Sequence, residues 1–202
     1  AEVTLGWAYD SRDHEFTPSR GVFHDITWRT APGTSTAGDV YGGLNITSRF
    51  YVTLLEDRLI GACRAMVDVL VGKPPFYELA WRGGYEPQEA IGGMYGVRGV
   101  PLHRYHGKVK AFANLELRAR LWRFSVFGQR FRLGGVAFVD GGRVWTDLAG
   151  NERLDGQDVG LKFGVGAGPR LQWGETFVIR MDVAWSPDAD PIGFYIEHRH
   201  IF

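Results

Sequence analysis

The clearest order in the chain lies between Lys108 and Trp122, where apolar and polar positions alternate. Successive side chains of an extended strand point to opposite faces, so a period of two over this length predicts one long strand. One face is apolar throughout, and the other is charged and interrupted by two aromatic residues. The apolar face carries Val109, Ala111, Ala113, Leu115, Leu117, Ala119 and Leu121, and the charged face carries Lys108, Lys110, Phe112, Asn114, Glu116, Arg118, Arg120 and Trp122.

The same alternation recurs from Asp158 to Trp173 and from Phe177 to Trp185. These stretches are longer than the strands of about 5–6 residues that are usual in soluble sheets. Together with weaker stretches elsewhere, the pattern predicts roughly nine strands in a meander and requires no helix. The weaker stretches are Val3–Asp10, Val22–Thr30, Leu44–Leu55, Leu59–Val71, Phe131–Val144 and Ile192–Phe202.

Connections between the expected strands alternate in length, and aromatic residues gather near the strand ends. Outer-membrane barrels have short turns on the periplasmic rim, long loops on the outer rim and aromatic girdles at both membrane interfaces. We therefore predict an all-β fold, an antiparallel transmembrane β-barrel of the bacterial outer membrane. After the turn at 11–20, the short links are 56–58, 125–130 and 174–175, and the longer ones are 31–38, 73–107 and 146–157. The aromatics near strand ends include Trp7, Trp28, Trp122, Trp145, Trp173 and Trp185.

Composition narrows the choice of function class. The 23 basic and 23 acidic side chains cancel, so the chain has no global field that would attract nucleic acid. The 28 glycines and 14% aromatic residues suit strands and turns better than a helix-rich domain. No window approaches the ~18 apolar residues of a membrane-spanning helix. A single cysteine, Cys63, excludes an internal disulfide.

Whether the number of strands is odd or even indicates whether the chain forms a complete barrel. Phe202 ends a strand that runs toward the short-turn rim, so an odd number of strands places Ala1 at the long-loop rim, where a complete barrel does not usually begin. We therefore expect residues 1–202 to form a single outer-membrane barrel domain or a barrel half. It would contain a long lumen or extracellular loop at about 73–107, and further strands of a larger protein or a second chain would complete it.

Several short motifs follow one another along nearly the whole chain. They are Tyr9–Asp13 with Pro18–Gly21, Gly92-Gly93 with Val97-Arg98-Gly99, Asn114–Arg118, and Phe138–Trp145. In this order they resemble the BamA/TamA family of outer-membrane barrel-assembly proteins, also called bacterial surface antigen proteins. The resemblance is to the C-terminal portion of the family's barrel.

The resemblance implies a particular role for the long loop. In the family, the loop arginine reaches into the lumen and pairs with acidic residues of the strands, which by position here are Arg98 with Glu116 and Asp140. A planar guanidinium that matches carboxylates would fasten the loop at one point, and Gly92, Gly93, Val97 and Gly99 complete the loop motif. The alternative is a solvated Arg98 and two ordinary lumen charges.

The chain end resembles a terminal barrel strand of the kind that is read during outer-membrane insertion. Gly193, Tyr195 and Phe202 carry this signal. The residues His198, Arg199 and His200 make the strand more polar than the family pattern. This departure leaves open whether the strand closes a barrel seam in the usual way.

Three function classes remain. The resemblance implies a protein that inserts or exports other outer-membrane proteins, with the lipid bilayer and client proteins as partners and with folding energy in place of a cofactor. The alternative is a passive pore or a membrane anchor for an N-terminal enzyme such as a patatin-like lipase. A third class is a soluble ligand-binding barrel, in which the apolar faces would point inward and the charged faces outward.

Catalytic and metal chemistry find little support in the sequence. The pairs His103 with His106 and His198 with His200 lack the third ligand that a zinc site requires. No serine or cysteine lies in a pattern that orders a catalytic triad. Gly164, Gly166 and Gly168 alternate on one strand face, which suggests packing against bulky loop residues rather than a phosphate loop. We predict a non-enzyme with no catalytic, cofactor or metal site.

Overall fold

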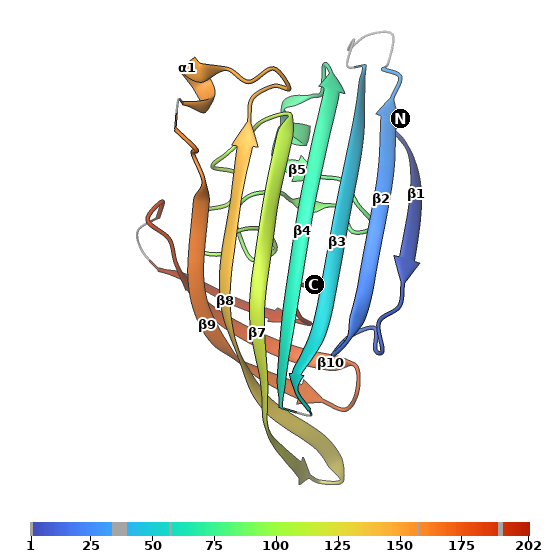
Figure 1. Cartoon of the computed structure of the whole chain (residues 1–202), viewed down its shortest axis with the longest axis vertical. Helices are drawn as coiled ribbons and strands as arrows, with labels where there is room; N and C mark the ends of the chain where they lie inside the picture. The colour runs from blue at the N-terminus through green and yellow to red at the C-terminus, as the bar shows by residue number, and fades with distance from the viewer. Residues whose placement is uncertain (1, 34–39, 57, 157, 190–191) are drawn as a thin grey trace.

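The chain forms a single large sheet in the computed structural model, which describes residues 2–33, 40–56, 58–156, 158–189 and 192–202. Within these residues nine strands pair antiparallel, each beside its neighbour in sequence (Figure 1). The predicted all-β meander is confirmed. The strands are β1 (Val3–Asp10), β2 (Gly21–Ala31), β3 (Tyr41–Leu55), β4 (Leu59–Gly72), β7 (Val109–Val126), β8 (Gln129–Trp145), β9 (Lys162–Trp173), β10 (Phe177–Trp185) and β11 (Gly193–His198).

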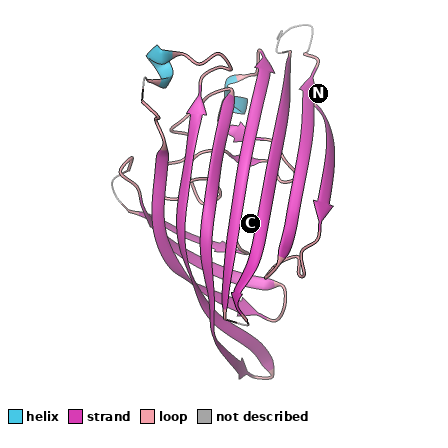
Figure 2. Ribbon diagram, viewed as in Figure 1, coloured by secondary structure: helices cyan, strands magenta, loops and turns pink. Residues whose placement is uncertain are grey.

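Short elements in the long loops depart from the strand-only prediction (Figure 2). The loop after β4 contains the 3-10 helix η1 (Phe76–Leu79) and a small hairpin of β5 (Trp81–Arg82) and β6 (Gln88–Glu89). A four-residue helix, α1 (Glu152–Asp155), precedes β9. None of these elements is long enough to produce a periodic signal in the sequence. The expected link at 31–38 lies mostly outside the described residues.

The two faces of the sheet have opposite chemistry. On β7, Asn114 and Glu116 are almost completely buried on the inner face, whereas Leu115 and Leu117 are 55% and 44% exposed on the outer face. Burial of polar groups inside and exposure of apolar groups outside is the reverse of a soluble barrel. The soluble ligand-binding alternative is therefore wrong for this sheet, and the outer face suits a lipid bilayer.

A bulge in β7 changes which residues share a face. The register between β7 and β8 shifts between Arg120 and Trp122, and Trp122 then pairs with Leu133. Leu133 lies on the outer face, so Trp122 lies there too, although strict alternation places it on the charged face. One extra residue in one strand of a pair causes such a reversal, and the predicted face of Trp122 is wrong.

Two strands are shorter than the sequence pattern predicts. The strand expected from Asp158 begins at Lys162, because Gly160 adopts a φ of +58° that interrupts the extended backbone. The strand expected to run to Phe202 ends at His198, and Arg199 has a φ of +81°. The last residues turn away from the sheet, and Ile201 and Phe202 become buried on the inner face beside Tyr51.

Two carboxylates organise the connection between β1 and β2. Asp10 forms an ion pair with Arg12, with 2.7 Å between Oδ2 and Nη2. Asp13 accepts hydrogen bonds from the main-chain N–H groups of Ser19 and Arg20 at 2.8 and 3.2 Å. Partial burial tends to raise the pKa of Asp13, but the hydrogen bonds from Ser19 and Arg20 outweigh it and lower this pKa below its ordinary value.

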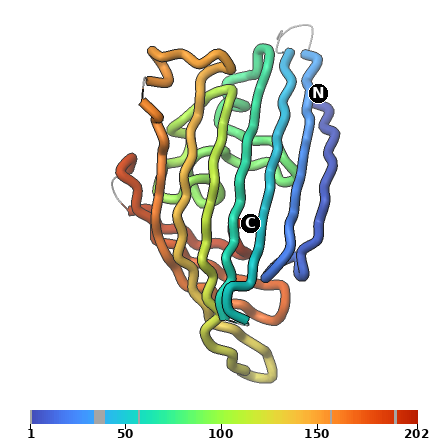
Figure 3. Tube along the Cα trace, viewed as in Figure 1, coloured from blue at the N-terminus to red at the C-terminus, as the bar shows by residue number. Residues whose placement is uncertain are grey.

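The loop between β4 and β7, residues 73–108, crosses the inner face of the sheet (Figure 3). We call it the inner loop. Its apolar residues Ile91, Val97 and Val100 pack with Met66 of β4 and Phe112 of β7. Burial of these side chains fixes the middle of the loop against the strands and positions the polar groups between them.

Candidate functional site

Glycines shape the inner loop where it approaches the strands. Gly92, Gly93 and Gly99 have φ values of +96°, +70° and +92°, which side chains with a Cβ rarely adopt. The main-chain N–H of Gly93 donates to the carbonyl of Val100 at 2.9 Å and closes the loop on itself. Val97 is completely buried in the apolar cluster. The closed loop therefore presents Arg98 at a defined place.

The structure brings Arg98 together with Glu116 and Asp140. Asp140 of β8 receives three hydrogen bonds from Arg98, from Nε at 2.7 Å, Nη2 at 3.0 Å and the main-chain N–H at 3.1 Å. Glu116 of β7 forms an ion pair with Nη1 at 2.8 Å. All three side chains are completely buried. Nε and Nη2 of Arg98 each donate to a different oxygen of Asp140, and an arginine–carboxylate pair with two such parallel hydrogen bonds is stronger than one with a single bond.

Phe138 and Gly164 shape the space around Arg98. The guanidinium carbon of Arg98 lies 3.4 Å from the centre of the Phe138 ring, which is a cation–π contact. A Cβ atom on Gly164 would overlap the main-chain oxygen of Arg98. The expectation that the glycine face of β9 packs against the loop therefore holds at Gly164 alone of the three glycines. A Cβ atom on Gly166 would overlap Phe138 of β8 and Val183 of β10, and one on Gly168 would overlap Met181 of β10.

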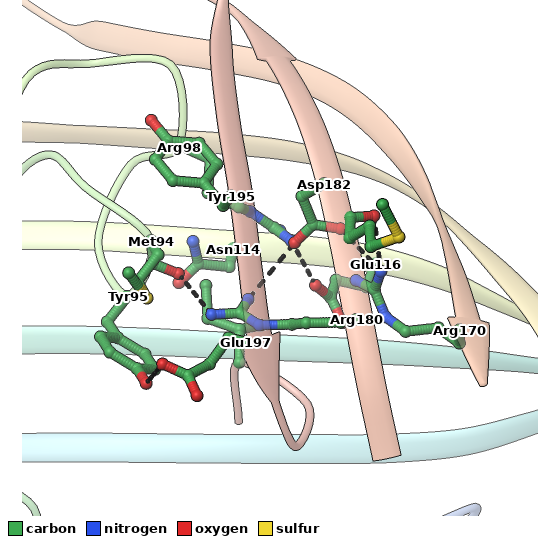
Figure 4. A network of polar contacts seen from close by, with 12 residues as sticks. Met94, Tyr95, Arg98, Asn114, Glu116, Arg170, Arg180, Asp182, Tyr195 and Glu197 are labelled. Carbon is green, nitrogen blue, oxygen red and sulfur yellow. Dashed lines mark hydrogen bonds and ion pairs between the residues drawn. The ribbon is translucent and has the colours of Figure 1, made fainter. Parts of the chain in front are cut away.

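Further charges complete the cluster, and the sequence analysis did not single them out (Figure 4). Asp182 of β10 contacts Nη1 of Arg98 at 3.1 Å. The same carboxylate pairs with Arg170 at 2.7 Å and Arg180 at 3.3 Å. These residues lie on the polar faces of their predicted strands, so alternation places them inward but does not show which inward charges meet.

Side chains of β4 and β7 also contact the inner loop beside this cluster. Asn114 of β7 donates to the carbonyl of Gly96 at 2.8 Å and accepts from Nε of Arg64 at 2.9 Å. Nη2 of Arg64 donates to the carbonyl of Tyr95 at 2.5 Å. Loop carbonyls that face the lumen thus find donors on β4 and β7, which satisfies buried backbone groups.

Asp68 organises a separate polar cluster, which we call the Asp68 cluster and which the sequence analysis missed. Arg29 binds its two oxygens at 2.9 and 3.0 Å, and Lys110 donates at 3.2 Å. The main-chain N–H of Gly83 in the inner loop also donates to Asp68 at 2.9 Å. The only available signal was the position of Asp68 on an inward face, in a strand whose alternation is weak.

The residues of the terminal signal separate in space. Tyr195 of β11 accepts a hydrogen bond from the main-chain N–H of Gly99 at 3.0 Å, and Gly193 pairs with Ala184 at the start of β11. Phe202 lies outside the strand, with its ring 5.0 Å from the guanidinium of Arg118. The inner loop therefore contacts β11 directly, while the last residue lies on the inner face.

No metal-binding group of three His, Cys, Asp or Glu residues occurs in the part of the chain that the structure describes. Within the same residues, no helix is long and apolar enough to cross a membrane. The candidate site is the buried network of charges around Arg98, which joins the inner loop to the strands.

A curved antiparallel sheet with an apolar outer face, a charged inner face and a loop folded inward defines a segment of a transmembrane β-barrel. The family model of the Omp85 superfamily domain matches residues 1–197. The chain belongs to the Omp85 superfamily, which agrees with the resemblance seen in the sequence motifs, and its place is the bacterial outer membrane. Barrels of this family are in general not enzymes.

Among solved structures, the chain is similar to BamA from Haemophilus ducreyi lacking POTRA domains 1–3. The TM-score is 0.67 at 18% sequence identity, over 98% of this chain and 41% of the BamA chain. This likeness supports the fold alone, and the chain spans less than half the length of that relative. A search of curated proteins finds no match.

Proposed function

We propose that this chain is the C-terminal part of a larger barrel that inserts or exports other outer-membrane proteins. The observation that carries the proposal is the attachment of the inner loop, through Arg98, to carboxylates of the three strands β7, β8 and β10. Membership of the Omp85 superfamily supports the same role.

The proposed mechanism uses folding energy rather than a cofactor. Unpaired backbone groups in lipid cost several kcal/mol each, so a weakly paired strand edge attracts an incoming strand. β11 has six residues, and its pairing with β10 ends at His198. We infer that the inner loop, which contacts β11 through Gly99 and Tyr195, holds this strand in position while client strands fold.

Arg98→Ala in the full-length protein tests the role of the cluster. Removing the guanidinium leaves the carboxylates of Glu116, Asp140 and Asp182 without a shared cation, and breaking a buried pair costs about 3–5 kcal/mol. We expect protease cleavage in the inner loop and at least a tenfold slower insertion of a radiolabelled client barrel into proteoliposomes. Asp140→Arg is expected to have the same effect.

Arg104→Ala is the control, because Arg104 lies exposed in the same loop and its side chain donates to the carbonyl of Asp188, outside the strands, rather than to a strand carboxylate. A released loop with full insertion activity would contradict the attachment role of Arg98. If the unaltered protein inserts no client at all, the assembly function itself is wrong, and a membrane anchor for an attached enzyme becomes the better explanation.

A further inference from the structure

A small cavity lies on the inner face of the sheet, near the short-turn rim, and its volume is about 40 Å³. Arg118 of β7 and Arg170 of β9 line it, together with Thr17 of the β1–β2 connection and His200 beyond β11. Gly134 of β8 lies opposite Arg170 in the register and contributes no side chain to fill the space. None of the described lining residues is acidic.

Arg118 and Arg170 carry buried N–H groups that have no acceptor. Each of these residues is only 4% exposed. Among the described residues, Nη1 of Arg118 and both Nε and Nη2 of Arg170 have no hydrogen-bond partner. Two further arginines of the lining, Arg120 and Arg132, have partners of their own. A buried charged donor without an acceptor is costly, so these three N–H groups favour a bound acceptor.

The carboxylates beside the cavity are shared with other cations. Glu116 pairs with both Arg118 and Arg98 at 2.8 Å. Asp182 pairs with Arg170 and with two further arginines (Figure 4). Neither carboxylate therefore belongs to one cavity arginine alone, and each guanidinium group receives only part of a negative charge.

His200 responds to the positive charge around the cavity. Burial and the positive charges of Arg118 and Arg170 hold the pKa of His200 well below its ordinary value, although Glu116 acts in the opposite direction. The neutral imidazole also has a buried Nδ1 without a hydrogen-bond partner. Water in the cavity would satisfy these polar groups but would not balance the charge, which an anion does.

We propose that this cavity binds one small inorganic anion of the size of chloride, held by the guanidinium groups of Arg118 and Arg170. A volume of about 40 Å³ has room for roughly one to three water-sized groups and is too small for a lipid headgroup. The bound anion would complete the neutralisation of the charges to which the inner loop is attached. This proposal concerns the stability of the barrel and does not rest on the assembly function.

Anomalous X-ray diffraction from crystals of the full-length protein grown in sodium bromide tests the site directly, because bromide replaces chloride and scatters anomalously. We expect an anomalous peak between Arg118 and Arg170. A cavity without a peak would overturn the proposal. Peaks confined to exposed side chains such as Arg130 would also overturn it, since they would indicate an adventitious ion only.

The midpoint of thermal unfolding, followed by heat-modifiable gel mobility in micelles, provides a second test. We expect the midpoint of the unaltered protein to be at least about 2 °C higher in chloride than in gluconate at equal ionic strength, because gluconate is too large for the cavity. Arg170→Gln is expected to abolish this difference. Arg130→Gln is the control and should retain it, because Arg130 is 77% exposed in its side chain and does not line the cavity.

Equal midpoints of the unaltered protein in the two salts would contradict the proposal, as would a chloride effect of full size in Arg170→Gln. The diffraction experiment uses the unaltered protein, so it decides the question even if Arg170→Gln does not fold. Because neither experiment measures client insertion, failure here is distinct from failure of the assembly function.

Discussion

A fully buried arginine is stable in the lumen because its charge is divided among several carboxylates. Moving a charged group out of water is costly unless opposite charges and hydrogen bonds replace the water. Arg98 meets this condition with Glu116, Asp140 and Asp182. A lysine has no planar fork and could not donate to these groups in the same directions.

Gly164→Ala is a prediction at the residue scale. The added Cβ would overlap the carbonyl oxygen of Arg98, and overpacking of this kind costs about 1–3 kcal/mol. We expect the loop backbone around Arg98 to move, so that amide hydrogen exchange at residues 96–99 becomes about tenfold faster. Mass spectrometry of peptides from the exchanged full-length protein measures this change.

Gly141→Ala serves as the control for Gly164→Ala. Its added Cβ would come no closer than 3.8 Å to any neighbouring atom, which is ordinary contact. Unchanged exchange in Gly164→Ala would show that the loop backbone does not depend on the close approach to β9.

At the scale of elements, two charged clusters on the sheet hold different parts of the inner loop, in addition to the single hydrogen bonds from Asn114, Arg64 and Tyr195. Arg98 joins its later part to β7, β8 and β10. Gly83 joins its earlier part to Asp68 of β4. Clusters at both parts of the loop limit sliding and rotation more than a single ion pair would.

Asp68→Ala tests whether these attachments act independently. The substitution removes the acceptor of the Gly83 N–H group and the partner of Arg29 and Lys110. We expect at least tenfold faster hydrogen exchange at residues 81–89, with little change at residues 96–99.

The control for Asp68→Ala is Asp147→Ala. Asp147 pairs with Lys108 at 2.9 Å on the exposed side of the loops, where an ion pair contributes little to stability. Equal loss of protection at both parts of the loop in Asp68→Ala would mean that the loop opens as one unit.

Whole-molecule behaviour follows from the opposite chemistry of the two faces. Leu5, Leu121 and Phe194 are among many apolar side chains more than half exposed on the outer face. Lipid or detergent must cover this surface, since a large exposed apolar surface drives association in water.

We therefore expect the protein to acquire its barrel structure only in detergent micelles or lipid. Heat-modifiable gel mobility and far-ultraviolet circular dichroism of the barrel, compared between micelles and plain buffer, provide the measurement. A folded β signal of equal size in buffer without detergent would contradict the membrane assignment of the outer face.

Most of the strands were predictable, because the alternation of apolar and polar residues is a local property of each strand's own sequence. The alternation at Phe177–Trp185 gave the observed bounds of β10, and that at Lys108–Trp122 located β7, which runs from Val109 to Val126. The position of Arg98 near Glu116 and Asp140 came from the resemblance of the motifs, since no local pattern joins a loop residue to two distant strands.

By itself, therefore, the sequence determined the strands, most of their faces and, from β3 onward, the alternation of short and long connections. Only the tertiary structure decided the face of Trp122, the inward turn after His198 and the identity of the charges that meet around Arg98 and Asp68. The reason is physical. Faces follow from neighbours along the chain, whereas bulges, chain reversals and ion pairs depend on which residues of different strands lie opposite one another.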